Sequence, residues 1–325
     1  MKRSLFLILF FVVLCVCSTI CAQSPISIYE GQMSPHTLAD WNLKGPVKTV
    51  SMTSFIRIKE DSTFHQQSKT ILEFDSVGRL TTETMIGWGA FEDKDTVVEY
   101  YQHDSLNRLS VRFSTDISFR QDFVYDDKGN FIYCIYTRNN GHPKPSWRHY
   151  YDDKGRCIRR EYIPGIDDKD LGYTIYQHFF QYDSMNHCIE KVTMPDGDTE
   201  LVERAKYDVQ GNITEKISYY GLWGGVDNLS QELYFYNEEG RLVKSQSFYD
   251  HVETNERFYE YNDLNQLIRV KTYDKEEDYL SSLYEMFYDQ YGNCVESIMS
   301  IFLRDQSLGM VRKTTYEYEY ADVGK

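Results

Sequence analysis

A short turn phrase recurs along almost the whole chain and constrains its fold more than any other feature. Residues 125–131 read Tyr-Asp-Asp-Lys-Gly-Asn-Phe: an aromatic residue, Asp or Asn, two variable residues, Gly or Asn, one further residue and an apolar one. With substitutions, nine copies of this phrase place their Asp or Asn at Asp75, Asp104, Asp126, Asp152, Asp183, Asp208, Asn237, Asn262 and Asp289. A tenth, degenerate copy occupies residues 320–325.

The phrase has the residues that close a β-hairpin. A type I turn followed by a residue with positive φ favours Asp or Asn first and Gly or Asn last. Gly and Asn enter the left-handed region at the lowest steric cost. The structural turn residues that we predict in this position are Gly78, Asn107, Gly129, Gly155, Asn186, Gly211, Gly240, Asn265 and Gly292.

Strand signals flank these turns. Aromatic runs such as 258–261 precede them, and segments that alternate with period two, such as 109–113 and 213–217, follow them. Successive copies lie 22 to 31 residues apart, which leaves room for two strands, the tight turn and one longer connection. We therefore predict an all-β fold, an antiparallel β-hairpin meander of about twenty strands in a long twisted or coiled sheet.

A longer period overlies the hairpin repeat. The first, fourth and seventh copies end in Gly-Arg, the third, sixth and ninth end in Gly-Asn, and the middle copies carry Asn in place of Gly. The middle copies are 79 residues apart both times. Duplication of a three-hairpin block of about 80 residues explains this order, and stacked neighbours would supply most of the stability.

The phrases at residues 125–130 and 151–156 resemble the YD, or RHS, repeats of bacterial secreted and cell-surface proteins. The resemblance covers roughly residues 70–325. Large members of that class coil their strands into a shell around a toxin or other cargo. This chain is short and has no following domain to act as cargo, so we expect an open, twisted or partly coiled sheet.

The first 22 residues have the layout of a secretory signal peptide. Lys2 and Arg3 precede an apolar run from Leu5 to Val16, and small and polar residues lead to Ala22. An uncleaved membrane anchor is the alternative, although the run is shorter than a bilayer requires. We predict cleavage after Ala22 and export to the periplasm, the cell surface or the extracellular space, with no later transmembrane segment.

The exported chain divides into an N-terminal segment, 23–45, and a single β-repeat domain, 46–325. Ser34-Pro35 followed by residues 36–43 and Gly45 predicts a short helix that covers the first sheet edge. Loss of Lys2 and Arg3 leaves 33 basic and 50 acidic side chains, a net charge of −17. This acidic balance argues against nucleic acid and against anionic membrane surfaces as partners.

Four cysteines remain after removal of the signal peptide: Cys134, Cys157, Cys188 and Cys294. The last three stand five residues after the Asp of their copies, where other copies carry Leu or Ile. Equivalent positions in neighbouring hairpins lie two strands apart, beyond the reach of a disulfide. We therefore expect free thiols that act as small core hydrophobes.

The connections opposite the tight turns vary in length and composition, and such loops commonly carry binding surfaces. Trp88, Trp147 and Trp223 lie in or beside them. A tryptophan can stack on a sugar ring or insert into a partner protein, or it can fold back and plug the end of the sheet. These three residues are our candidate binding residues, for a protein or a cell-surface glycan. The 28 tyrosines are better explained by cross-strand aromatic ladders.

No motif indicates a metal, a cofactor or a catalytic group. The acidic segments 167–170 and 196–200 lack the spacing of a calcium loop, and the eight histidines show no zinc spacing. His149 and His178 are predicted on strands and His187 in a tight turn. Nucleophile elbow, phosphate-loop and HExxH motifs do not occur.

Three functions follow from these patterns. The leading hypothesis is a non-enzymatic exported β-repeat scaffold that binds a protein or glycan through its loop edge. The second is an assembly component that pairs through exposed sheet edges, suggested by the final strand at residues 314–320. The third is a hydrolase on a concave face, for which Glu317 and Glu319 share one strand face, although solvent exposure explains them more simply.

Overall fold

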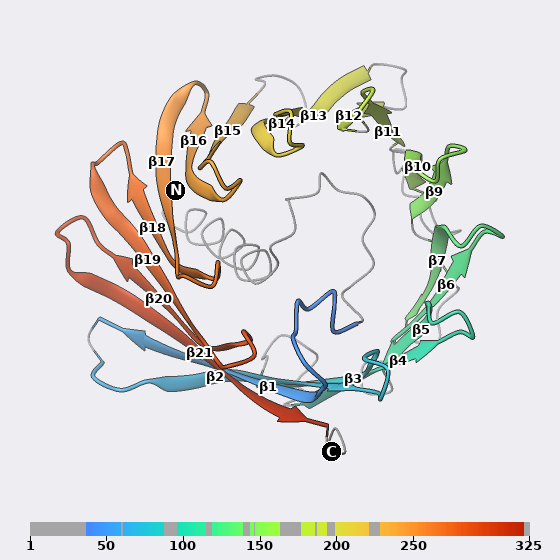
Figure 1. Cartoon of the computed structure of the whole chain (residues 1–325), viewed down its shortest axis with the longest axis horizontal. Coiled ribbons are helices and arrows are strands. Elements are labelled where there is room, and N and C mark those ends of the chain that lie inside the picture. The colour runs from blue at the N-terminus through green and yellow to red at the C-terminus, as the bar shows by residue number, and fades with distance from the viewer. Residues whose placement is uncertain are drawn as a thin grey trace.

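The computed structural model describes residues 37–59, 61–87, 96–114, 119–138, 144–145, 147–162, 177–185, 187–193, 199–220 and 228–321. Within these ranges the protein is all-β, as the sequence predicts. Twenty-one strands form one sheet, and paired strands run antiparallel. Figure 1 shows them arranged in a ring, in chain order.

The strands are β1 (Val47–Ile58), β2 (His65–Phe74), β3 (Leu80–Ile86), β4 (Thr96–His103), β5 (Leu109–Ser114), β6 (Phe119–Tyr125), β7 (Phe131–Arg138), β8 (Lys144–Pro145), β9 (Trp147–Tyr151), β10 (Cys157–Tyr162), β11 (Gln177–Tyr182), β12 (Cys188–Thr193), β13 (Thr199–Tyr207), β14 (Ile213–Tyr220), β15 (Asn228–Tyr236), β16 (Leu242–Tyr249), β17 (Val252–Tyr261), β18 (Leu267–Asp274), β19 (Tyr279–Tyr288), β20 (Cys294–Phe302) and β21 (Leu308–Tyr320).

The two ends of the sheet meet. β1 pairs with β2 on one side and with β21 on the other, at eleven positions from Val47↔Tyr320 to Ile58↔Met310. The predicted open sheet is therefore wrong, and the final strand has a covering strand. Twist and coiling accumulate from strand to strand until the first and last strands lie side by side, and their pairing removes two exposed edges.

The ring is least regular between β7 and β9. The short strand β8 pairs with Ile135 and Tyr136 of β7. On the other side of this junction, the ring nitrogen Nδ1 of His149 in β9 lies 3.3 Å from the carbonyl oxygen of Ile132 in β7. Side chains thus supply part of the contact between these two strands.

The recurring phrase forms the same turn in each described copy. In the third copy the Gly129 N–H donates to the Asp126 carbonyl at 3.0 Å, and the Asp126 N–H donates to the Asn130 carbonyl at 2.9 Å. The Asp126 carboxylate accepts the N–H groups of Lys128 and Asn130. The turn residues with positive φ, at +62° to +91°, are Gly78, Asn107, Gly129, Gly155, Gly211, Gly240, Asn265 and Gly292, while Asn186 lies outside the described residues.

In the first six copies the residue after Gly or Asn also donates, through its side chain, to the carboxylate of the turn's Asp. The Asn130 amide donates to the second carboxylate oxygen of Asp126 at 2.8 Å, and the Arg156 guanidinium does the same for Asp152. The side-chain hydrogen bond from Asn130, followed by the backbone N–H donors, lowers the pKa of Asp126 below its ordinary value. In these copies Arg and Asn are therefore two ways of binding one carboxylate, whereas Arg241 binds Asn265 and Asn293 binds Lys44 and Tyr320.

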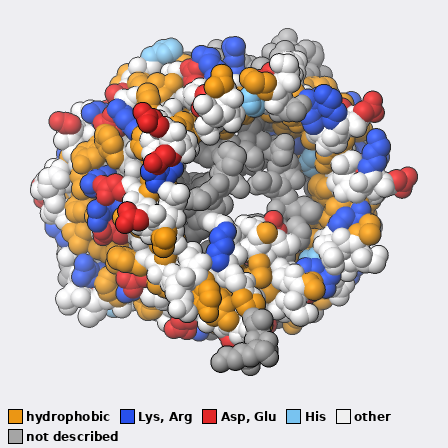
Figure 2. All heavy atoms as spheres, viewed as in Figure 1, with side chains coloured by type: hydrophobic (Ala, Val, Ile, Leu, Met, Phe, Trp, Pro, Cys, Tyr) orange, Lys and Arg blue, Asp and Glu red, His pale blue; other side chains and the backbone are white. Residues whose placement is uncertain are grey.

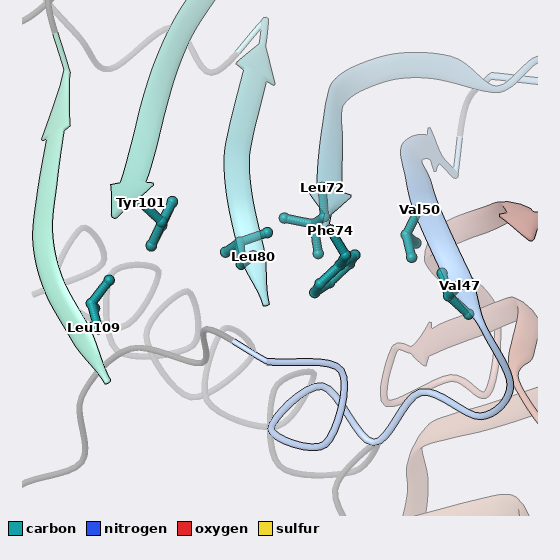
Figure 3. Close-up of a cluster of buried hydrophobic side chains, with 7 residues drawn as sticks. All are labelled: Val47, Val50, Leu72, Phe74, Leu80, Tyr101 and Leu109. Atoms are coloured by element: carbon teal, nitrogen blue, oxygen red, sulfur yellow. The ribbon is translucent and has the colours of Figure 1, made fainter. Parts of the chain in front are cut away.

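One face of the sheet carries the apolar core. In β4 the side chains of Val97, Glu99 and Tyr101 are buried, whereas Tyr100 and Gln102 between and beyond them are exposed. Leu38, Trp41 and Leu43 of the N-terminal segment, which runs within the outline of the ring in Figure 1, pack against this buried face. The buried face is therefore the inner wall. Figure 3 shows its largest cluster, which consists of Val47, Val50, Leu72, Phe74, Leu80, Tyr101 and Leu109.

A tyrosine near the end of each strand that leads into a turn fastens most hairpins to the hairpin before them. We call this contact the tyrosine clamp: the hydroxyl donates to the backbone carbonyl of the residue that opens the second strand of the preceding hairpin, at 2.6 to 3.0 Å. The pairs are Tyr125 to Leu109, Tyr151 to Phe131, Tyr182 to Cys157, Tyr236 to Ile213, Tyr261 to Leu242, Tyr288 to Leu267 and Tyr318 to Cys294.

The clamp satisfies a backbone group that the strand ladder does not reach. Between β14 and β15 the pairing begins at Glu215↔Leu233, two residues beyond Ile213. The Tyr236 hydroxyl supplies a donor to the Ile213 carbonyl there, at 2.9 Å. Burial raises the pKa of Tyr236 to about 12, so its phenol keeps the donated proton. A part-buried carbonyl without this donor would cost stability.

The cysteines lie in the core. Cys134, Cys157, Cys188 and Cys294 are buried as free thiols, each with 7% of its surface exposed. Cys157 and Cys188 share one cluster with Phe180. They occupy the positions taken by Leu80 and Leu109 in other copies, as the repeat register predicts.

The predicted N-terminal helix is not seen in the described residues. Residues 37–42 form turns with a single α-type hydrogen bond, from the Trp41 N–H to the Thr37 carbonyl. The Asn42 N–H donates to Ala39 and the Leu43 N–H to Leu38, which closes the turns without extending a helix. Thr37 is also bridged to Arg79, and the Leu38 N–H donates to the Gly78 carbonyl. These bonds to the first hairpin turn replace those that would extend a helix, so the segment packs on the inner wall rather than over a sheet edge.

Replacement of Gly240 tests the turn geometry. Its φ is +74°, and an added Cβ would meet nothing within 4 Å, so the cost is conformational rather than steric. We expect Gly240→Ala to lower the free energy of unfolding by about 1 kcal/mol, and Gly240→Asn to lower it by less. Urea denaturation measures both. Equal stability of the Ala variant and the parent protein would contradict the assignment.

Removal of one hydroxyl tests the tyrosine clamp. Tyr236→Phe keeps the ring in its cluster with Ile213 but leaves the carbonyl without that donor. We expect a loss of about 1 to 2 kcal/mol in the free energy of unfolding. Tyr249→Phe, at a tyrosine that is 47% exposed, is the matched control and should change stability little. Similar losses in the two variants would argue against the clamp.

Candidate functional site

Figure 2 shows the molecule hollowed at the centre of the ring. The inner wall around this hollow is apolar near the tight turns, which share one rim because they join alternate pairs of strands. Among its apolar side chains the inner wall also buries polar ones, including Glu99, His149 and Ser245. The other rim carries the variable connections.

Of the three candidate tryptophans, the structure describes Trp147. It opens β9, directly after the connection at 139–146, and is half-buried. Because His149 and Tyr151 follow at alternate positions, Trp147 faces the inner wall at the end nearest the variable connections. Trp88 and Trp223 lie outside the described residues.

Trp147 belongs to a group that we call the Arg160 cluster, formed by Trp147, His149, Arg160, His178 and Phe180. The guanidinium carbon of Arg160 lies 5.0 Å from the Trp147 ring centroid and 5.6 Å from that of Phe180. The rings of Trp147 and His178 meet edge to face, with centroids 4.8 Å apart. A cation is thus held between two aromatic faces beside a histidine.

The register of three adjacent strands produces this arrangement. Arg160 in β10 pairs with His149 in β9 and with His178 in β11. Trp147 pairs with Tyr162, two residues farther along β10. Four polar or aromatic side chains from three consecutive strands therefore lie in one patch of the inner wall.

His149 anchors the cluster to β7. Its side chain is buried, its ring contacts Phe131 with centroids 5.1 Å apart, and its Nδ1 donates to the Ile132 carbonyl. Burial, and then the positive charge of Arg160, lower the pKa of His149 below its ordinary value of 6.5. The imidazole is therefore neutral at pH 7 with its proton on Nδ1.

The opposite face of the same strands has a different chemistry. Arg159 lies 3.9 Å over the Tyr150 ring and forms an ion pair with Glu161 at 3.7 Å, and the Tyr150 hydroxyl donates to Glu161. Arg159 and Arg160 are adjacent in β10, and their side chains therefore lie on opposite faces of the sheet. Arg159 binds an acidic group of its own chain, and Arg160 stands between aromatic rings.

A second polar group on the inner wall, the Glu99 cluster, consists of Glu83, Glu99, Tyr101 and Arg112. Glu83 and Glu99 are directly opposite each other in β3 and β4. The Tyr101 hydroxyl lies 2.7 Å from Glu83 and 3.3 Å from Glu99, and Arg112 binds Glu99 at 2.5 Å. Burial, and then the charge of Glu99, raise the pKa of Glu83. These groups bind one another, so the cluster supports the wall.

No metal centre is found where the structure describes the chain, since no group of three or more His, Cys, Asp or Glu side chains there could hold an ion. The acidic segment at 167–170 lies outside the described residues. The His187 Nδ1–H donates to the Asp183 carboxylate within its turn at 2.8 Å, and the His187 ring stacks on Tyr207. In the described part of the chain, no helix has the length and apolar character needed to cross a membrane.

Sequence reasoning found Trp147 but missed its neighbours. A hairpin centred on the turn after Asp152 places His149 opposite Arg160, so half of the cluster could have been found from the turn position. His178 could not, because the connection at 163–176 has no pattern that sets the register between β10 and β11.

Comparisons with known proteins identify neither a family nor a curated relative: a scan of protein-family models and a search of curated proteins find no match. Among solved structures, a porin-like protein from Bacteroides uniformis aligns with a TM-score of 0.36 and 12% identity, over 85% of this chain and 99% of that one. TcdB2-TccC3 without its hypervariable C-terminal region aligns with a TM-score of 0.19 and 11% identity, over 94% of this chain and 27% of that one.

A pH titration tests the environment of His149. Because the folded state lowers its pKa, the unfolded chain binds more protons, and stability falls as the pH drops through and below about 6.5. We expect the free energy of unfolding of His149→Gln to depend less on pH between 7 and 5 than that of the parent protein. Identical slopes in urea denaturation at each pH would contradict a buried neutral imidazole.

Proposed function

We propose that the protein is an exported, non-enzymatic binding scaffold that receives a glycan at the Arg160 cluster. The observation that supports this most is the placement of Arg160 between the rings of Trp147 and Phe180 with histidines on both neighbouring strands. An indole offers a flat apolar face to a sugar ring, and guanidinium and imidazole groups donate hydrogen bonds to hydroxyl and carboxylate oxygens.

The position of the cluster suits entry from the rim that carries the variable connections. Trp147 opens β9, Arg160 stands two residues before the end of β10, and His178 is the second residue of β11. All three therefore lie at the loop end of the inner wall. A chain-like ligand that enters there would meet Trp147 before the apolar region near the tight turns.

The positive charge of Arg160 favours a glycan with acidic groups. A guanidinium binds a carboxylate or sulfate in a bidentate manner, and a neutral sugar cannot use this contact fully. The rest of the chain is acidic and repels anions elsewhere on the surface. An acidic glycan would therefore bind at Arg160 rather than non-specifically.

The other two hypotheses have less support. β1 covers the final strand, which was the reason to consider assembly through an exposed edge. Glu317 and Glu319, considered for a hydrolase, are exposed on the outer face, where Glu319 pairs with Lys48 at 2.9 Å.

Binding of defined oligosaccharides tests the proposal. We expect an acidic oligogalacturonate to bind the exported chain more tightly than neutral malto- or cello-oligosaccharides of the same length, by isothermal titration calorimetry. Trp147→Ala and Arg160→Gln should each weaken that binding about tenfold or more. Arg159→Gln, one residue away on the outer wall, is the matched control and should bind like the parent protein.

The outcomes separate the inner wall from the loop edge. Binding lost in Trp88→Ala with Trp223→Ala but retained in Trp147→Ala would move the site to the variable connections. No binding of any acidic or neutral oligosaccharide, by a chain with an intact β-sheet circular dichroism spectrum, would overturn the glycan proposal. Equal losses in Arg159→Gln and Arg160→Gln would indicate a general electrostatic effect.

A further inference from the structure

The tips of the tight turns carry large apolar side chains that are unusually exposed. We define the tip position as the third residue of each turn, two residues after its Asp or Asn. Five of the nine tips are apolar or aromatic, with exposed fractions between 51% and 78%: Val77, Leu106, Met185, Leu264 and Tyr291. The remaining tips are Lys128, Lys154, Gln210 and Glu239, which are also exposed.

All nine tips lie on one rim of the ring. Each tight turn joins one strand to the next, and strands alternate in direction around a single closed sheet, so the turns share an end. Their order around the rim is their order in the chain (Figure 1). The other rim also exposes apolar side chains, among them Ile58, Val252 and Leu303, so the tips are distinguished by their recurrence at one turn position. We take this regular apolar surface as an interaction surface.

The nine tips are arranged symmetrically about the fifth tip, Met185, so that the tips on its two sides can pair with each other. A two-fold axis through the rim at Met185 brings the first tip against the ninth, the second against the eighth, the third against the seventh and the fourth against the sixth. The resulting contacts are Val77 with Tyr291, Leu106 with Leu264, Lys128 with Glu239, Lys154 with Gln210, and Met185 with itself.

We propose that this rim, the tip rim, binds a second copy of the chain in a two-fold symmetric dimer. An isologous interface requires a surface that complements itself, so that residue i meets j and j meets i. The tips meet this requirement in both polarity and charge: apolar tips meet apolar tips, and a lysine meets a glutamate. Dimerisation would place the two hollows end to end and leave the loop rims free.

The charges next to the tips set the conditions for association. Asp127, Asp153, Glu238 and Asp263 precede four of the tips and are exposed, and Glu239 also binds Arg241 of its own turn. The two-fold axis that brings Lys128 to Glu239 also brings Asp127 toward Glu238. The rim is therefore weakly acidic, and repulsion between copies is screened at physiological ionic strength. The contacts are small, so we expect a dissociation constant on the order of 10 µM.

Charge exchange tests the pairing of the third and seventh tips. The mass of the exported chain, measured by sedimentation at about 0.15 M salt, should double as its concentration rises through the micromolar range. Lys128→Glu and Glu239→Lys should each weaken the dimer about tenfold, and the double variant should restore it. Thermal melting of each variant checks that the turn at residues 237–241 remains folded. A parent chain that stays monomeric to about 1 mM overturns the proposal.

A cysteine at the fifth tip tests the symmetry axis. M185C should form a disulfide between two copies under mild oxidation, because its Cα atoms would lie within the roughly 7 Å that a disulfide spans. The native cysteines are buried and do not compete. V252C, at the first residue of β17 on the other rim, where Val252 is 56% exposed, is the matched control. A dimer that M185C does not cross-link, or that V252C cross-links equally, would place the interface elsewhere.

Discussion

The tyrosine clamp is the interaction on which the rest of this structure depends. A hairpin repeat can pair its strands within each hairpin, but neighbouring hairpins separate where their turns diverge, and this leaves part-buried carbonyl groups without a ladder partner. A phenol on the inner wall reaches across that gap in seven of the described contacts between neighbouring hairpins, as Tyr236 does for Ile213. Because a buried unpaired carbonyl is costly, the tyrosines that end most of these strands contribute a hydroxyl as well as apolar surface; the first two copies have Phe74 and His103 before the turn instead.

Closure of the ring follows from repetition of this contact. Each clamp fixes how one hairpin sits on the next, and the accumulated twist brings β21 to β1. The seam has its own version of the clamp: Asn293 binds both Lys44 and the Tyr320 hydroxyl, and the Ala321 N–H donates to the Pro46 carbonyl. The N-terminal segment thus joins the last turns to the first strand. Closure also gives the sheet an inner and an outer wall and two different rims. A flat meander would have two equally accessible faces.

These surfaces differ in chemistry because their constraints differ. The tight-turn rim must keep its Asp or Asn and its Gly or Asn, so variation is confined to the two middle turn residues, where the complementary tips occur. The inner wall is mostly apolar but buries polar groups such as Glu99, and toward the variable connections Arg160 lies among aromatic rings. On the outer wall, side chains such as Arg159 and Glu161 pair with each other in ordinary surface ion pairs of small energetic value.

The sequence by itself determined the elements of this protein. The Asp and Gly of each phrase set the turns, and those turns set the register inside each hairpin, which already places His149 opposite Arg160. The cysteines could be assigned to the core from the same register. Local patterns suffice for these features because each depends on residues within about ten positions of a turn.

Only the tertiary structure decided the register between neighbouring hairpins and the pairing of the first strand with the last. The register across a long connection, as between Arg160 and His178, has no local signal, because loop length and loop residues leave it open. The pairing of β1 with β21 depends on twist summed over the whole sheet, and the failure of the N-terminal helix depends on a turn at Gly78 that it contacts. The Arg160 cluster depends on the register of three consecutive strands, whereas the shared rim of turn tips depends on the closed ring, which brings together residues that are far apart in the chain.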